Sequence, residues 1–279
     1  MPETISLTPE QIEFYRREGY LTLPAITTPH EVAWLRGVYD RLFEQRAGRD
    51  RGDQFDLGGT DEEGKPAVLP QILMPVRYAP ELASGVFRSN ALAVARQLLG
   101  PECLAQGEHA ILKPAGIGAP TPWHQDEAYW NSEMEYNALS IWIPLQDATL
   151  ENGCMNFVPR SHLSEIVPHH TIGRDTRVHG LEIDEGVADL SGAVACPIAA
   201  GGCTIHHNRT LHYAGPNRTS EPRRAYILAF GIPPRKRAVA RDFYWNRTKQ
   251  TPREQRAQAA RASQDAQSAA KQQNQTSSL

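Results

Sequence analysis

The stretch Pro122-Trp123-His124-Gln125-Asp126 directly follows a segment, residues 113–120, that is rich in proline and glycine. It places a histidine and an aspartate two positions apart, and alternate residues of a strand point to the same face. We therefore expect a strand at a sheet edge, from which His124 and Asp126 reach one metal ion together. A short H-x-D sequence also occurs often by chance, so this interpretation needs a third ligand elsewhere in the chain.

Three histidines in one later run are candidates for that third ligand. His206, His207 and His212 lie between two glycine-containing turns. A strand that ends at His212 would present its ring at a sheet edge, but spacing alone does not choose among the three. Any one of them would complete, with the H-x-D pair, the 2-His-1-carboxylate arrangement that leaves three positions open on Fe(II).

Arg223 begins a strand-like segment with a face of small and apolar residues. It shares this face with Ala225, Ile227 and Ala229, whereas Arg224 belongs to the opposite face. A guanidinium at the head of such a face can enter a cavity and bind a carboxylate through two parallel hydrogen bonds. The alternative, which composition alone favours, is a surface arginine at the entrance of a strand.

The periodicity of the chain changes near residue 100. Helical spacing and capping residues predict helices over about 9–18, 29–45 and 82–99, with a short strand at 20–23 between the first two. After residue 102, short apolar runs separated by turn residues predict a β-sandwich or barrel. The strands are expected at 108–113, 137–145, 155–158, 193–197, 202–206 and 223–232.

The domain prediction is one catalytic domain over residues 1–250. Its helical part covers about 1–100 and its β core about 101–235. Residues 251–279 form a polar tail, disordered or helical, of which we expect about 255–279 to be dispensable for the chemistry, so that truncation at Thr251 leaves turnover intact. Two long polar segments, 46–68 and 163–192, are expected to flank the mouth of the pocket.

Bulk properties exclude several classes of partner. The 279 residues carry a net charge of −3, and the sequence pI is near 6.4, which gives no indication of a nucleic acid or an anionic membrane as partner. No apolar run approaches the ~18 residues that cross a bilayer. The first residues lack the basic-then-apolar pattern of a secretion signal, so we expect a cytoplasmic protein.

Several motifs together give the chain a family resemblance. They are His124-Gln125-Asp126, Trp142, Glu151-Asn152-Gly153-Cys154-Met155, Pro159-Arg160-Ser161-His162, His212 followed by Gly215-Pro216-Asn217, and Arg223. In this order and with these gaps, the sequence resembles the phytanoyl-CoA dioxygenase family. The resemblance implies a mainly β fold with flanking helices, in which a double-stranded β-helix (a jelly-roll, cupin-like core) follows N-terminal helices. It extends from about residue 11 to about residue 232.

The resemblance also assigns roles to residues. It implies that His124, Asp126 and His212 bind iron, and thereby selects His212 among the three later histidines. It implies that Arg223 binds the distal carboxylate of 2-oxoglutarate. The same comparison places Trp142 and His109 beside the cosubstrate, although a core tryptophan in a strand is the alternative for Trp142 and the match around His109 is loose.

The implied activity is that of a non-haem dioxygenase. Its cofactors are Fe(II), 2-oxoglutarate as cosubstrate and O2, and it would hydroxylate a C–H bond of a small-molecule metabolite while releasing succinate and CO2. Asp126 is present, whereas halogenating members carry a small residue there, so hydroxylation is favoured. We expect a monomer or homodimer. The alternatives are a non-catalytic metal-binding jelly-roll and a cupin-like metal isomerase or hydrolase, neither of which requires Arg223 beside the metal.

Overall fold

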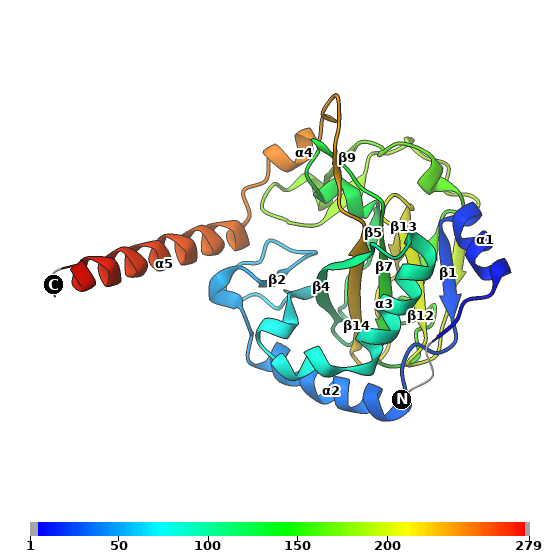
Figure 1. The fold of residues 1–279 in the computed structure, drawn as a ribbon, viewed down its shortest axis with the longest axis horizontal. Coiled ribbons are helices and arrows are strands. Elements are labelled where there is room, and N and C mark those ends of the chain that lie inside the picture. Colours follow the sequence, from blue (N-terminus) through cyan, green and yellow to red (C-terminus); the bar gives the residue numbers. More distant parts are fainter. Residues whose placement is uncertain (1–4, 277–279) are drawn as a thin grey trace.

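Two antiparallel sheets that pack against each other form the centre of the computed structural model, which describes residues 5–276 (Figure 1). The larger sheet has the strand order β1 (Tyr20–Leu23), β12 (Cys203–His207), β7 (Ala138–Pro144), β14 (Arg223–Gly231), β4 (Leu104–Lys113), β3 (Pro70–Leu73) and β2 (Gln54–Asp56). The smaller sheet has the order β11 (Val194–Cys196), β8 (Met155–Phe157), β13 (His212–Ala214) and β5 (Thr121–His124).

Helices and two small two-stranded sheets lie around these sheets. The α-helices are α1 (Pro9–Glu18), α2 (Pro29–Glu44), α3 (Val86–Leu99), α4 (Tyr244–Arg247) and α5 (Pro252–Thr276). The 3-10 helices are η1 (Arg49–Arg51), η2 (Pro75–Arg77), η3 (Pro80–Ser84), η4 (Asp126–Tyr129), η5 (Ser161–Leu163) and η6 (Ile172–Arg174). The two-stranded sheets pair β9 (His169–Thr171) with β10 (Leu181–Ile183), and β6 (Met134–Glu135) with the distant β15 (Arg235–Lys236).

The two faces of the larger sheet bury different sets of side chains. On one face, apolar residues of β7 and β14 pack with those of the helices α1, α2 and α3 in the main core. On the other face, Trp142 and Ile227 pack against Met155, Phe157 and Ala214 of the smaller sheet. Because successive residues of a strand alternate between faces, both sides of β7 are buried, which explains its continuous apolar sequence. The chain is therefore mainly β with flanking helices.

The predicted elements are largely present. The first two helices and the strand between them occur as expected, with Thr8 and Thr28 as side-chain caps. Five of the six expected strands agree within two residues at each end: β7, β8, β11, β12 and β14. The sixth, β4, begins four residues before the predicted position, at Leu104.

The third helix begins later than predicted. Residues 80–84 form η3, and α3 starts only at Val86, because Gly85 has an extended backbone (φ −63°, ψ 135°). The carboxylate of Glu31 in α2 accepts hydrogen bonds from the backbone N–H groups of Val86 and Phe87, at 2.5 and 2.9 Å. A side chain from another helix thus caps α3, and a sequence pattern read along one helix does not contain that information.

The segment 46–68, which we expected to be a loop, contributes a strand to the larger sheet. Asp56 at the end of β2 accepts hydrogen bonds from the backbone N–H groups of Val68 and Leu69, each at 2.9 Å. These bonds close the polar segment 57–67 and bring β3 beside β2. The pairing is non-local, and the short strand Gln54–Asp56 lies within a polar run that lacks the alternation typical of a strand.

Beyond the sheets, α5 extends away from the rest of the molecule (Figure 1). Its first turns contact η1 and the loop after it: Arg253 Nε donates to the carbonyl oxygen of Gly52 at 2.9 Å, and Arg256 forms an ion pair with Asp61. Within residues 5–276, no helix has both the length and the apolar character needed to cross a membrane.

Candidate active site

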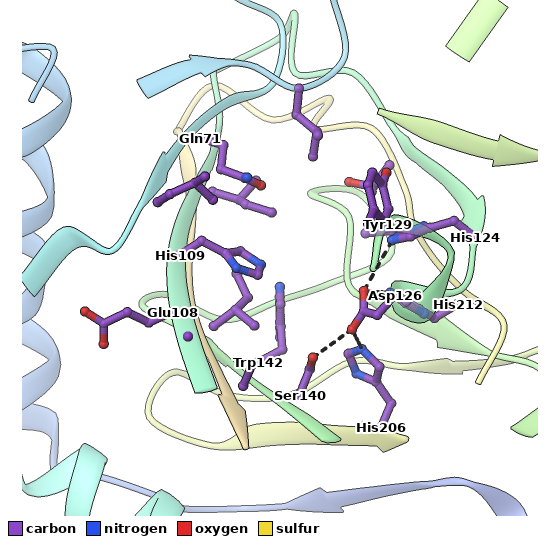
Figure 2. A pocket seen from close by; sticks show the side chains of 18 of the residues that line it. Gln71, Glu108, His109, His124, Asp126, Tyr129, Ser140, Trp142, His206 and His212 are labelled. Atoms are coloured by element: carbon purple, nitrogen blue, oxygen red, sulfur yellow. Dashed lines mark hydrogen bonds and ion pairs between the residues drawn. The ribbon is translucent and has the colours of Figure 1, made fainter. Parts of the chain in front are cut away.

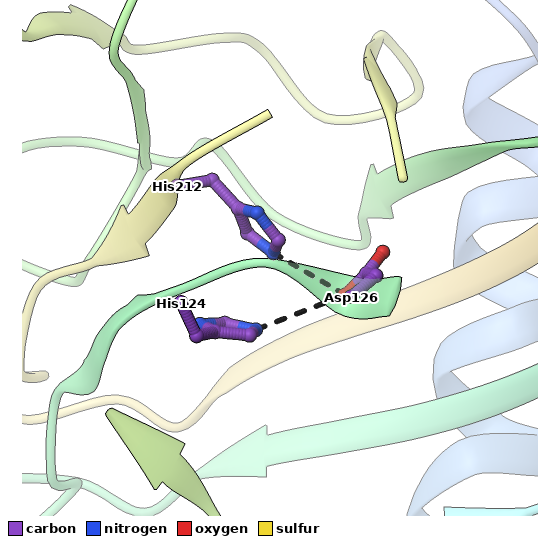
Figure 3. A group of neighbouring side chains, drawn as sticks. All are labelled: His124, Asp126 and His212. Atoms are coloured by element: carbon purple, nitrogen blue, oxygen red, sulfur yellow. Dashed lines mark ion pairs between the residues drawn. The ribbon is translucent and has the colours of Figure 1, made fainter. Parts of the chain in front are cut away.

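The side chains of His124 and Asp126 meet the side chain of His212, the last histidine of the later run, at one point. His124 ends β5 and His212 begins β13, and the two residues are direct partners across these strands. The Nε2 atoms of His124 and His212 lie 3.8 and 3.5 Å from Oδ1 of Asp126 (Figure 3). One nitrogen or oxygen atom from each residue lies within 4.8 Å of the others, so the three can surround a single ion.

Backbone hydrogen bonds orient both histidine rings. Nδ1 of His124 lies 2.7 Å from the carbonyl oxygen of Pro122, and Nδ1 of His212 lies 2.8 Å from that of Thr210. A proton on each Nδ1 donates to the carbonyl and leaves the Nε2 lone pair directed at the shared point. Burial lowers the pKa of His124 to about 3, so its ring is neutral at physiological pH and able to bind a metal.

The H-x-D pair does not lie within one strand, as the spacing led us to expect. The strand β5 ends at His124, and Asp126 starts the 3-10 helix η4. Gln125 still has an extended backbone (φ −121°, ψ 131°), so Asp126 turns to the same side as His124 before the chain leaves the sheet. His212 likewise starts β13 rather than ending a strand.

The aspartate has two further neighbours: Ser140, which the sequence did not indicate, and His206, which it offered only as a candidate metal ligand. Ser140 Oγ donates to Oδ2 of Asp126 at 2.7 Å, and His206 Nε2 lies 3.2 Å from the same oxygen. Burial raises the pKa of Asp126, but His212 and the hydrogen bond from His206 outweigh this effect, and the pKa lies well below its ordinary value. Asp126 is therefore an ionised carboxylate with a fixed orientation.

A cavity of about 440 Å³ opens beside this cluster, between the two sheets (Figure 2). Trp142 and His109 line it, as does Arg223 from β14. Ile227 and Ala229 also line it, whereas Arg224 forms an ion pair with Asp40 of α2. The predicted division of β14 into a cavity face and an outer face is thus confirmed.

Arg223 is buried, and in the part of the chain that the structure describes no carboxylate forms an ion pair with it. Its side chain is 1% exposed, and within residues 5–276 its Nε and Nη1 atoms have no hydrogen-bond partner. Its guanidinium carbon lies 5.3 Å from the ring centre of Trp142. Burial lowers the pKa of Arg223 to about 10, so the group remains charged at neutral pH. A buried guanidinium with free donors fits an anionic ligand.

The segment 163–192 is hydrogen-bonded to Gln125, the middle residue of the His124-Gln125-Asp126 motif. His169 Nε2 accepts a hydrogen bond from the backbone N–H of Gln125 at 3.2 Å, and the side-chain oxygen of Gln125 accepts one from the N–H of Val167 at 2.9 Å. The residue between His124 and Asp126 is thereby fixed to the hairpin β9–β10. The segment 163–192 contains three histidines, His169, His170 and His179, and nothing in the sequence distinguishes His169 from the other two.

Three aromatic residues that follow Asp126 in the sequence form part of the cavity wall. Tyr129, Trp130 and Tyr136 all line it. The rings of Trp130 and Tyr136 meet edge to face, with centres 4.8 Å apart. The hydroxyl of Tyr129 accepts a hydrogen bond from the backbone N–H of Leu181 at 2.7 Å, which fixes its ring. This wall gives the cavity an apolar side with few polar groups.

Comparisons with known proteins agree with this geometry. A model of the family described as phytanoyl-CoA dioxygenase (PhyH) matches residues 15–225. The crystal structure of EvdO2 from Micromonospora carbonacea var. aurantiaca, which is also known in complex with 2-oxoglutarate, has 42% sequence identity and a TM-score of 0.76. That similarity covers 88% of this chain and 99% of EvdO2.

Two further proteins are similar over most of their length. The L-proline trans-4-hydroxylase of Streptomyces griseoviridis is 29% identical over 232 residues, 77% of this chain and 82% of the hydroxylase. The epimerase SnoN from nogalamycin biosynthesis, in complex with Fe3+, alpha-ketoglutarate and nogalamycin RO, is 25% identical with a TM-score of 0.62. That likeness covers 87% of this chain and 89% of SnoN.

Proposed function

Because this chain belongs to the phytanoyl-CoA dioxygenase family and is a 2-oxoglutarate-dependent dioxygenase, we propose that it hydroxylates an unactivated C–H bond of a small-molecule metabolite. The observation that carries the proposal is the position of the His124, Asp126 and His212 cluster in the same cavity as the buried, unpaired Arg223. In the balanced reaction, the substrate gains one oxygen atom from O2, and 2-oxoglutarate is converted to succinate and CO2.

The metal of the proposed site is Fe(II), held by Nε2 of His124, Oδ1 of Asp126 and Nε2 of His212. The donor set fits this ion, since it combines two imidazoles with one ionised carboxylate. All three side chains line the cavity, so positions remain for other ligands on that side. When bound, Fe(II) supplies the binding of O2 and the oxidising chemistry, which no side chain provides.

In this proposal, Arg223 binds the distal carboxylate of 2-oxoglutarate. A buried carboxylate is costly unless it is paired, and a guanidinium offers two parallel charge-assisted hydrogen bonds. The stacking of Arg223 over Trp142 keeps the guanidinium pointed into the cavity. Trp142 and His109, which line the same cavity, are proposed as walls of the cosubstrate site.

The aromatic wall of Tyr129, Trp130 and Tyr136 is proposed to bind the substrate. It borders the same cavity as the three proposed iron ligands, so a bound molecule would present its C–H bond to the metal position. A substrate bound against this half-buried wall would cover its apolar surface and exclude water from the reacting atoms. The chain itself therefore orients cosubstrate and substrate and keeps the cavity dry.

The finer description of the fold is also a proposal. The two packed antiparallel sheets support a double-stranded β-helix, or jelly-roll, over about residues 101–235 of a single catalytic domain. We propose a monomer or homodimer that acts on small molecules.

An alternative function, in which the same fold binds a metal but does not react with 2-oxoglutarate, leaves the buried, charged Arg223 unexplained.

The test of the proposed function is aerobic incubation of the protein with Fe(II) and 2-oxoglutarate, with succinate measured over time. We expect succinate from the wild type and none from Asp126→Ala or His212→Ala. The matched control is His207→Ala, because His207 is buried next to the site but faces His162, with ring centres 5.4 Å apart. If the wild type forms no succinate, or if the Asp126→Ala and His212→Ala variants still form it, the proposed function is wrong.

A further inference from the structure

The two oxygens of Asp126 face different parts of the molecule. Oδ1 is directed at His124 and His212 of the smaller sheet, at 3.8 and 3.5 Å from their Nε2 atoms. Oδ2 accepts a hydrogen bond from Ser140 Oγ at 2.7 Å and lies 3.2 Å from Nε2 of His206 (Figure 2). The carboxylate therefore connects the two sheets through separate oxygens.

The register of the larger sheet explains why both donors reach Oδ2. Ser140 on β7 and His206 on β12 are direct partners across the two strands, so their side chains emerge side by side on the same face. Both side chains are buried. The pairing of β7 with β12 thus fixes the positions of the two hydrogen-bond donors.

The ring of His206 is a hydrogen-bond donor to Asp126. Its Nδ1 atom is buried and has no hydrogen-bond partner in the part of the chain that the structure describes. A proton on Nδ1 would be left unpaired, whereas a proton on Nε2 is accepted by the carboxylate. With Nε2 protonated, His206 has no lone pair directed at the metal position, and this separates its role from that of His212.

We propose that Ser140 and His206 are positioning residues that hold Oδ2 of Asp126, so that the carboxylate binds the metal through Oδ1 alone. This inference rests on the proposed function. A carboxylate with both oxygens free can rotate and bind through both of them, which occupies a position that the cosubstrate or O2 requires. Partners of this kind typically contribute 10–100-fold to metal affinity or activity.

The test measures Co(II) binding to the full-length protein without cosubstrate, by calorimetry and by visible absorption. The variants are Ser140→Ala, His206→Leu and His206→Gln, because the amide nitrogen of glutamine can restore the donor near the position of Nε2. The control is His207→Leu, which changes the neighbouring buried histidine on the other side of β12. Thermal unfolding of the metal-free proteins shows which variants fold.

We expect Ser140→Ala and His206→Leu to lower Co(II) affinity by about 10–100-fold and to alter the absorption bands. His206→Gln and His207→Leu should stay near the wild-type values. Wild-type affinity and spectrum in both Ser140→Ala and His206→Leu, with binding lost in Asp126→Ala, would overturn this inference and leave the proposed function intact. Unchanged Co(II) binding by Asp126→Ala would overturn both. Should His206→Leu fail to fold, Ser140→Ala decides the question, since it removes only one oxygen atom.

Discussion

Lys113 and Arg223 are direct partners on the neighbouring strands β4 and β14, and both are fully buried. Two cations directly opposite each other in a sheet destabilise it unless an anion lies between them. The ammonium of Lys113 donates to the carbonyl oxygens of Ala119 and Ala214, at 2.5 and 3.3 Å. Burial, together with the charge of Arg223, lowers the pKa of Lys113 well below its ordinary value. Arg223, which lines the cavity, therefore lies beside a second buried basic group, and an anionic ligand bound at Arg223 would offset the positive charge there.

The first prediction concerns Arg223. Replacing it with alanine removes the only proposed partner of the distal carboxylate, so we expect the affinity for 2-oxoglutarate to fall by about 2–5 kcal/mol. Metal binding should persist, because the three proposed ligands are untouched. The measurement is a 2-oxoglutarate titration with metal content determined in parallel. Arg224→Ala is the control: its ion pair with Asp40 lies on the outer face, and an effect as large as that of Arg223→Ala would refute the assignment.

Lys113 is expected to contribute through its charge. Lys113→Met keeps the length of the side chain but removes the ammonium, so we expect the KM for 2-oxoglutarate to rise several-fold with little change in kcat. Steady-state kinetics over a range of 2-oxoglutarate concentrations measures both constants. A KM for 2-oxoglutarate equal to that of the wild type would show that the charge of Lys113 makes no contribution.

The fold was predictable where the information is local. Capping at Thr8 and Thr28 and the apolar runs of β7 and β14 indicated elements that the structure contains. The start of α3 was not predictable, because its cap is Glu31 of another helix. Nor was β2, whose pairing depends on the hydrogen bonds that Asp56 accepts from residues 68 and 69. In both cases a contact between distant segments decided the structure.

For the site, the sequence indicated which residues carry unusual chemistry but not which residues support them. Alternation along one strand placed Arg223 on the small, apolar face, and the family resemblance gave its role. The alternation is present in the structure. Ser140, His206 and His169 are hydrogen-bonded to the H-Q-D motif from other strands, and the sequence indicated a supporting role for none of them. Their positions depend on sheet register, which one sequence does not reveal.

The buried His169 predicts an acid-sensitive stability. Its Nδ1 lies 2.7 Å from the carbonyl oxygen of Val167 and its Nε2 accepts from Gln125, so the folded protein requires the neutral ring. Burial lowers the pKa of His169 from 6.5 to about 4. Between these values the unfolded chain binds a proton that the folded chain does not, so stability falls as the pH is lowered from 6.5 towards 4.

Urea unfolding at several pH values tests this effect. In His169→Gln, the amide oxygen can still accept the N–H of Gln125 but does not titrate. The slope of unfolding free energy against pH should therefore be smaller than in the wild type, by up to about 1.4 kcal/mol per pH unit between pH 5 and 6. Identical slopes in the two proteins would show that His169 is not responsible.

The last prediction divides the C-terminal tail into two parts. We expected from composition that the whole tail is dispensable, but the first turns of α5 hold the segment 49–61. The guanidinium of Arg253 lies 4.5 Å from the ring centre of Phe55, and Arg256 Nε donates to the carbonyl oxygen of Arg49 at 3.1 Å. Leu57 of this segment lines the cavity, so loss of these contacts should loosen one cavity wall.

A chain ending at residue 251 should therefore melt a few degrees lower and exchange amide hydrogens faster in residues 49–61. A chain ending at residue 266 keeps both arginines and should match the full-length protein in both measurements. The double variant Arg253→Ala/Arg256→Ala in the full chain should reproduce the shorter truncation, because it removes the same contacts without shortening the helix. If residues 49–61 are equally protected in all four proteins, α5 does not support the cavity, and the original expectation for the tail applies to its whole length.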